Sequence, residues 1–168
     1  MPSPQRIDPP RTGDERATLQ GFLDYQRATL AWKCDGLTAA QLRERAVPPS
    51  ALSLLGLVRH LAEVERGWFR RGVAGEQIGY LYCTQDDPDA DFDRVDDASV
   101  EEALAAWRDE RQRAQEIVAT APSLDSTFKR GDQDVSLRWL LCHLIEEYSR
   151  HNGHADLLRE RLDGQTGE

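Results

Sequence analysis

The sequence has few cysteines, which argues against a disulfide-stabilised protein. Only three occur among 168 residues, and no CxxC pair is present. An odd number at wide spacing is typical of reduced thiols in a cytoplasmic protein. We expect Cys142, which lies in an apolar segment, to be a small buried residue.

Long apolar runs are absent as well. No stretch is long enough to span a bilayer, so we expect neither a membrane span nor a membrane partner. Residues 1–13 are polar and rich in proline, and they lack the apolar centre of a signal peptide. We interpret them as a loosely held tail before a single domain at residues 14–168.

The sequence also lacks a basic cluster. Its 21 lysines and arginines are outnumbered by 30 acidic residues, which gives a formal net charge of −9. Such a field repels phosphate backbones, and we therefore expect no nucleic-acid partner. The most acidic stretch, residues 86–97, has neither the central glycine nor the closing glutamate of an EF-hand loop. We interpret it as a solvated acidic loop without helical or strand periodicity.

Apolar residues recur at helical spacing in four long segments. These segments are residues 14–35, 53–71, 99–121 and 136–162. Thr38 is a plausible N-cap for a further short helix, and Ser99 with Glu102 forms a capping box. Gly36 and Gly164 end the first and the last long segments.

Four long helices without convincing strands predict an all-α fold, a four-helix bundle. The connections that flank the third helix are long, which argues against the simplest up-down-up-down arrangement. In the second of these connections, residues 126–137 are compatible with a small hairpin.

The main polar feature is a stripe of histidine and glutamate on the last helix. His143, Glu147, His151 and His154 follow one another at intervals of 4, 4 and 3 residues, which places them on one helix face. The stripe lies beside the apolar one, so it should face inward or line a cleft. Gly153 costs about 1 kcal/mol inside a helix, which suggests a packing or functional reason for it.

This stripe suggests a metal site. Glu147 and His151, at i and i+4, can reach one ion, and an open site needs about three protein ligands. His60 is the only histidine outside the last helix, and it lies beside the apolar stripe of the second. We predict that His60, Glu147 and His151 bind one divalent ion and leave positions open to water or substrate. The alternative is that these histidines are ordinary core or surface residues, because such spacing also occurs on solvated helices.

Two segments carry a family resemblance: LVRHLAEVERGWFRR at residues 57–71 and LLCHLIEEYSRHNGHADLLRE at residues 140–160. They resemble the DinB-like superfamily, specifically its mini-circle protein subfamily, and the resemblance extends from about Asp14 to Leu162. It implies an up-down-down-up four-helix bundle with one metal ion in the core.

The resemblance also implies roles for individual residues. His60 and His151 match the first and last histidines of the common DinB pattern, whereas Glu147 departs from its middle histidine. The mycothiol-dependent maleylpyruvate isomerases are similar in using His, Glu and His. His154 matches a position often held by glutamine, so we expect it to support the ligands. His143 is expected to orient Glu147 or to cap the pocket.

The activity that the resemblance implies is thiol transfer in detoxification. DinB-like branches use bacillithiol, mycothiol or glutathione, and we expect mycothiol here, with Zn²⁺ or Ni²⁺ as the metal. A bound metal lowers the pKa of a coordinated thiol and holds it as the thiolate. Trp68, Tyr148 and Arg150 are near the ligands in sequence, although we expect Trp68 in the core and Arg150 on the surface.

Two other functions stay open. A hydrolase or isomerase would activate water on the same metal, with Glu146 or His154 as the general base. A non-enzymatic bundle would bind a small ligand or a partner, with a structural metal or none. We expect a small-molecule partner in the enzymatic cases, and a homodimer because bundles often have apolar surface left over.

Overall fold

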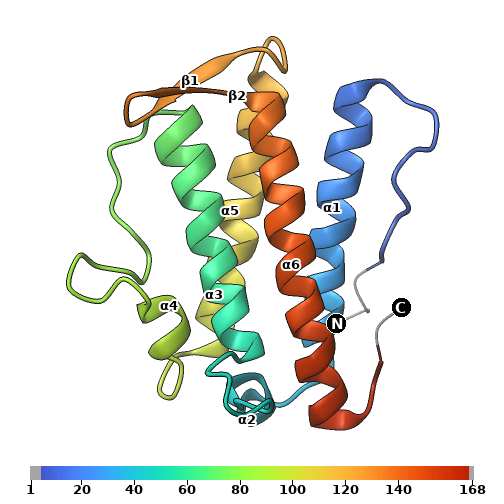
Figure 1. Cartoon of the computed structure of the whole chain (residues 1–168), viewed down its shortest axis with the longest axis vertical. Coiled ribbons are helices and arrows are strands. Elements are labelled where there is room, and N and C mark those ends of the chain that lie inside the picture. Colours follow the sequence, from blue (N-terminus) through green and yellow to red (C-terminus); the bar gives the residue numbers. More distant parts are fainter. Residues whose placement is uncertain (1–4, 167–168) are drawn as a thin grey trace. The chain divides into compact units, whose positions relative to one another are not determined.

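The computed structural model describes residues 5–166, which are predominantly helical (Figure 1). The elements in chain order are α1 (Glu15–Cys34), α2 (Ala39–Arg43), α3 (Leu54–Glu65), the π-helical segment η1 (Arg66–Val73), α4 (Ala90–Asp93), α5 (Val100–Thr120), β1 (Thr127–Arg130), β2 (Gln133–Ser136) and α6 (Leu137–Asp163). All four predicted long helices are present, as α1, α3 with η1, α5 and α6. No helix in the described range combines the length and apolar character that crossing a membrane requires.

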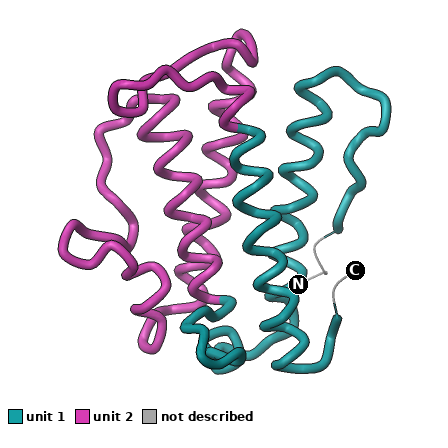
Figure 2. The backbone as a smooth tube through the Cα atoms, in the orientation of Figure 1, with its two compact units in different colours: residues 1–54, 141–168 teal, residues 55–140 magenta. Residues whose placement is uncertain are grey.

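The chain divides into two compact units, which Figure 2 shows in different colours. Unit 1 comprises the chain up to Leu54 and from Leu141 onward, and unit 2 comprises Leu55–Leu140. Unit 1 therefore contains α1, α2 and most of α6. Unit 2 contains nearly all of α3, then η1, α4, α5 and the hairpin.

Side chains cap the starts of α1 and α2, and the predicted N-cap Thr38 is confirmed. The Asp14 side chain accepts a hydrogen bond from the Ala17 backbone N–H, and α1 ends where Gly36 takes φ +75°. Thr38 and Gln41 form a complete capping box at the start of α2. Each cap satisfies backbone groups that the first or last helical turn leaves unpaired.

In unit 1, α1 and α6 run in the same direction. The Asn152 side chain donates to the Gln26 backbone oxygen at 3.0 Å. Seven residues further along both helices, the buried Arg159 donates to the Lys33 carbonyl oxygen at 2.9 Å. Arg159 thus satisfies a carbonyl at the C-terminal end of α1 that the helix itself leaves unpaired.

Leu157 and Gly153 of α6 both lie on the exposed side of the helix. Leu157 is 57% exposed, because the neighbouring Leu158 takes the buried position on that turn. At Gly153, an added Cβ would meet no atom within 4 Å among the described residues. Close packing at this point therefore does not explain the glycine.

The predicted tail falls partly outside the described residues, since positions 1–4 are not described. Residues 5–13 have no regular secondary structure, but they contact α1. The Arg6 guanidinium carbon lies 4.2 Å from the centre of the Trp32 ring. A Cβ at Gly21 would come within 2.7 Å of Pro10 Cδ, so this glycine permits the close approach. A single domain over residues 14–168 stays a prediction.

In unit 2, α3 and α5 also run in the same direction (Figure 1). After Glu65 the second predicted helix changes to π-helical hydrogen bonding, in which the Ala74 N–H donates to the Phe69 oxygen. Glu110 of α5 is buried and accepts from Arg66 at 2.6 Å and from Arg70 at 3.0 Å. These two ion pairs join η1 to α5.

The possible hairpin is confirmed, so one two-stranded sheet departs from the expected all-α class. β1 pairs antiparallel with β2, with Phe128 opposite Val135 and Arg130 opposite Gln133. Gly131, at φ +60°, supplies the left-handed conformation that the turn requires. The side chain of Arg130 donates to the Gly67 carbonyl oxygen at 3.1 Å, which attaches the hairpin to η1.

The acidic stretch differs from its prediction as a solvated loop. It contains the short helix α4, and Asp91 in that helix is only 3% exposed. Arg59 of α3 donates from Nε to the Asp91 carbonyl oxygen at 3.0 Å and from Nη2 to the Ala90 carbonyl oxygen at 2.9 Å. The buried Val95 follows α4, so apolar contacts as well as hydrogen bonds hold the segment.

The ion pair at the end of α6 predicts a pH-dependent loss of stability. Arg159 Nη2 lies 2.7 Å from Asp163 Oδ2, and this hydrogen-bonded partner lowers the pKa of Asp163. The stabilisation should be complete above the ordinary pKa of about 3.9 and should disappear as the pH falls through the lowered value. We expect Asp163→Asn to lower the free energy of unfolding by less than about 1 kcal/mol at pH 7.

The measurement is urea unfolding of both proteins between pH 7 and pH 2. The difference between them should shrink at the acidic end, whereas the control Glu160→Gln, an exposed position on the same helix, should show no such trend. A difference that stays constant down to pH 2 would contradict the assigned ion pair.

Candidate functional site

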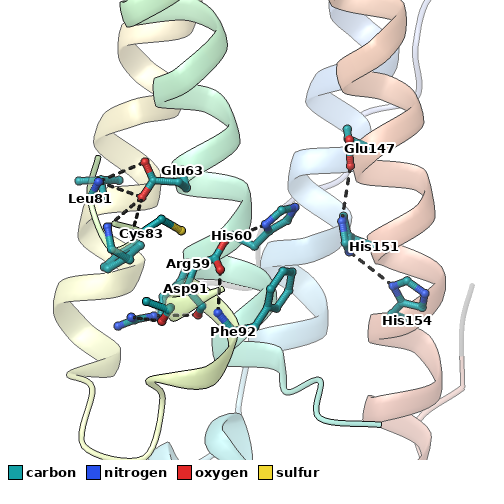
Figure 3. Close-up of polar contacts among 12 residues, drawn as sticks. Arg59, His60, Glu63, Leu81, Cys83, Asp91, Phe92, Glu147, His151 and His154 are labelled. Carbon is teal, nitrogen blue, oxygen red and sulfur yellow. Dashed lines mark hydrogen bonds and ion pairs between the residues drawn. The ribbon is translucent and has the colours of Figure 1, made fainter. Parts of the chain in front are cut away.

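Unit 1 brings the predicted residues of α6 together on one helix face (Figure 3). His151 Nε2 lies 3.5 Å from Glu147 Oε2, and His151 Nδ1 lies 3.4 Å from His154 Nδ1. His151 is buried, whereas Glu147 and His154 are partly exposed. The predicted stripe therefore exists, with a carboxylate on one side of the His151 ring and a second imidazole on the other.

His143 and Glu146 lie at the upstream end of this stripe. His143 Nε2 is 3.7 Å from Glu147 Oε1, so His143 contacts Glu147 from one turn away, as expected. The Glu146 side chain is 66% exposed, and its Oε1 lies 3.5 Å from Arg150 Nη2. Arg150 is on the surface, as predicted.

Unit 2 holds His60 on α3 in a defined orientation (Figure 3). His60 Nδ1 lies 2.8 Å from Asp91 Oδ2, and the His60 ring stacks on Phe92 with 4.5 Å between ring centroids. The other carboxylate oxygen, Asp91 Oδ1, accepts from the Phe92 backbone N–H at 2.9 Å. Because the carboxylate accepts, Nδ1 carries the proton, and in the neutral ring Nε2 then has the lone pair that a metal ligand needs.

Asp91 is a functional candidate that sequence reasoning missed. It lies within a run of seven aspartates at residues 86–97, and nothing in the composition distinguishes it from the others. The available signal was the pattern of apolar residues inside the run, since Ala90 and Val95 are both buried. Such residues indicate that part of an acidic segment packs against the protein.

A cavity of about 950 Å³ lies in unit 2 beside His60. Its lining comes from α3, η1, the segment before α4, α4 itself and the hairpin. The polar and aromatic residues among this lining include His60, Glu63, Trp68, Arg71, Tyr80, Cys83, Asp91, Lys129 and Arg130. This size suits small-molecule substrates. Trp68 was expected in the core, but it is partly exposed at this cavity.

One cavity wall is fixed by a buried carboxylate. Glu63 of α3 is 9% exposed, and its Oε2 accepts from the backbone N–H groups of Leu81 and Tyr82, each at 2.8 Å. The Arg59 guanidinium carbon lies 4.0 Å from the centre of the Tyr82 ring. These contacts hold the segment that carries Tyr80 and Cys83, although it has no regular secondary structure.

The cysteines differ strongly in their surroundings. Burial raises the pKa of the Cys83 thiol to about 11 and that of the Cys34 thiol to about 12. Cys142 was expected to be buried but is exposed, because its position on α6 lies on the side of the helix opposite the apolar residues. Cys83 lies at the cavity, yet its raised pKa keeps it protonated near neutral pH, when it is a poor nucleophile.

This difference predicts an order of thiol modification. Raising the Cys83 pKa from 9.0 to about 11 lowers its thiolate fraction at pH 8 by about a hundredfold. We expect iodoacetamide to label Cys142 first, Cys83 much more slowly and Cys34 last, as measured by peptide mass spectrometry. Labelling in denaturant, where the three should react alike, is the control. Preferential labelling of Cys83 in the folded protein would contradict its assignment as an inert thiol.

The helical fold, with Glu147 and His151 on α6 and His60 on α3, agrees with the pattern that the resemblance to DinB-like proteins implies. The family model for mycothiol-S-transferase matches residues 18–164, most of the chain. The chain therefore belongs to the mycothiol-S-transferase family, which is DinB-like, and the predicted superfamily is confirmed. A search of curated proteins found no match.

Proposed function

We propose that this protein is a metal-dependent enzyme that transfers mycothiol to electrophilic small molecules in detoxification. The observation that carries the proposal is the match to the mycothiol-S-transferase family over residues 18–164. The polar residues of α6, the oriented His60 and the adjoining cavity support it, because they supply ligand atoms and space for a substrate.

The metal site that we propose consists of His60, Glu147 and His151. The two histidines each offer a ring nitrogen and Glu147 offers a carboxylate oxygen, a donor set that suits Zn²⁺ or Ni²⁺. When bound, such an ion lowers the pKa of a thiol that coordinates it and holds the sulfur as the thiolate. The chain's own cavity thiol, Cys83, has a raised pKa, which makes it a poor competing nucleophile near neutral pH.

The remaining residues of the site act on the ligands. Asp91 holds the proton of His60 on Nδ1 and so presents Nε2 as the donor atom. His154 contacts Nδ1 of His151, and His143 contacts Oε1 of Glu147, the carboxylate oxygen that does not face His151. We propose that these three residues orient the ligands and do not bind the metal themselves.

For the architecture, we propose the up-down-down-up four-helix bundle. This connectivity needs the first and last long helices to run in the same direction, and likewise the second and third. Each unit supplies one such pair, α1 with α6 and α3 with α5. The homodimer and the cytoplasmic location stay predictions.

The water-activating alternative has less support. Of its two candidate general bases, Glu146 is 66% exposed, and its two carboxylate oxygens lie 3.5 Å from Arg150 Nη2 and 3.8 Å from His143 Nδ1. His154 remains the other candidate. A general base needs to lie within hydrogen-bond reach of the water that it activates.

Thiol-transfer kinetics test the proposed activity. Wild type should transfer mycothiol to a chloronitrobenzene electrophile, and Glu147→Ala should lower kcat/KM by about a hundredfold or more, because a ligand is lost. Glu146→Ala is the matched control, one position away and exposed, and it should stay within about threefold of wild type. A wild type that hydrolyses esters but ignores mycothiol would contradict the proposal in favour of the alternative.

Zinc affinity tests the role of Asp91. Asp91→Asn removes the carboxylate that orients His60, and we expect the affinity for zinc to fall about 10- to 100-fold in isothermal titration. The control Asp97→Asn removes an exposed carboxylate from the same acidic stretch and should leave the affinity unchanged. Equal affinities of Asp91→Asn and wild type would show that His60 does not depend on Asp91, or is no ligand.

A further inference from the structure

One wall of the unit 2 cavity is basic, although the chain as a whole has a formal net charge of −9. Arg71 from η1, together with Lys129 and Arg130 from β1, lines it. The π-helical turn and the hairpin thus place three cationic side chains at one cavity in an acidic protein.

Aromatic rings hold the two arginines in place. The Arg130 guanidinium carbon lies 4.0 Å from the centre of the Trp68 ring, and that of Arg71 lies 4.1 Å from the centre of the Tyr80 ring. Trp68 in turn packs against Trp139 at 5.7 Å between ring centroids. A guanidinium that stacks through its face keeps its N–H groups around the edge, where they can donate to an anion.

In the part of the chain that the structure describes, Arg71 and Arg130 differ from their basic neighbours in having no carboxylate partner. Neighbouring Arg66 and Arg70 both pair with Glu110, and Lys129 pairs with Asp134 at 3.0 Å. Within residues 5–166, by contrast, neither Arg71 nor Arg130 forms an ion pair. Burial lowers the pKa of Arg130, and the nearby charge of Arg71 lowers it further. Two close and unbalanced cations repel each other, and a bound anion would relieve that repulsion.

We propose that Arg71 and Arg130 form a binding site for the carboxylate of an anionic electrophilic substrate. The proposal rests on the proposed thiol transfer, because it assigns the His60 end of the cavity to the thiol and the arginine end to the electrophile. His60 on α3 and Arg71 on η1 both line the cavity and are eleven positions apart, which is at most about 16 Å at the rise of an α-helix. That length accommodates a thiol beside His60 and an electrophile whose carboxylate reaches the arginines.

The first test measures binding without any reaction. The probes are 4-nitrobenzoate and 4-nitrobenzamide, which match in size and differ in charge, and binding is followed by isothermal titration. We expect wild type to prefer the benzoate, and Arg71→Gln and Arg130→Gln each to weaken its binding about tenfold or more without affecting the amide. Arg130→Lys, which keeps the charge but loses the fork of N–H groups, should be intermediate.

The control for this test is Arg94→Gln. Arg94 is 74% exposed, pairs with Asp87 and does not line this cavity, so its loss should leave benzoate binding unchanged. Thermal unfolding of each variant checks that it folds. Equal binding of the two probes to wild type, or equal weakening by Arg94→Gln, would overturn the proposal.

The second test asks whether the arginines bind the electrophile or mycothiol. The mycothiol sulfur attacks the ring carbon of 4-chloro-3-nitrobenzoate, a C–S bond forms, and chloride leaves with the bonding electron pair while the thiol proton passes to solvent. Arg130→Gln should lower kcat/KM about tenfold or more for this substrate and less than about threefold for its amide. KM for mycothiol should not change.

If KM for mycothiol rises and the two electrophiles are equally affected, the arginines bind mycothiol and not the electrophile. That result would overturn the proposal. If wild type transfers mycothiol to neither electrophile, the proposed function fails, and the binding measurement alone then decides whether the arginines form an anion site.

Discussion

The proposed metal site depends on the hydrogen bond between Asp91 and His60. A neutral histidine can present either ring nitrogen, and only a partner on one of them selects the other as a donor atom. Asp91 is buried and lies 2.8 Å from His60 Nδ1, and Arg59 binds the backbone of the same residue. The acidic stretch around α4 is therefore a structural support for α3 and not a solvated loop.

Two features of the cavity in unit 2 determine its chemistry: the protonation of the Cys83 thiol and the positive charges of Arg71 and Arg130. Burial raises the pKa of the Cys83 thiol, which makes it a poor nucleophile near neutral pH, and the proposed reaction takes its sulfur from mycothiol. At the hairpin end, Arg71 and Arg130 carry charges that no ion pair within residues 5–166 offsets. We infer that this cavity, which His60 and the two arginines line, accommodates a thiol and an anionic electrophile.

Much of this could be predicted from the sequence, because helix periodicity and capping are local properties. Asp14, Thr38 and Gly36 fix helix ends through their own backbone neighbours, and the spacing of Glu147 and His151 places both on one face. The π-helical segment, the burial of Asp91 and the basic wall were not predictable. Each depends on contacts between residues far apart in the chain, such as Arg59 with Asp91 and Arg130 with Gly67.

The metal content of untagged protein tests the central claim most directly. Elemental analysis should find about one zinc or nickel ion per wild-type chain, and much less in either His60→Ala or Glu147→Ala. Loss of metal in both variants would establish that α3 and α6 each contribute a ligand to one ion. A correctly folded wild type without metal, or variants that keep a full complement, would contradict the site and with it the proposed activation of the thiol.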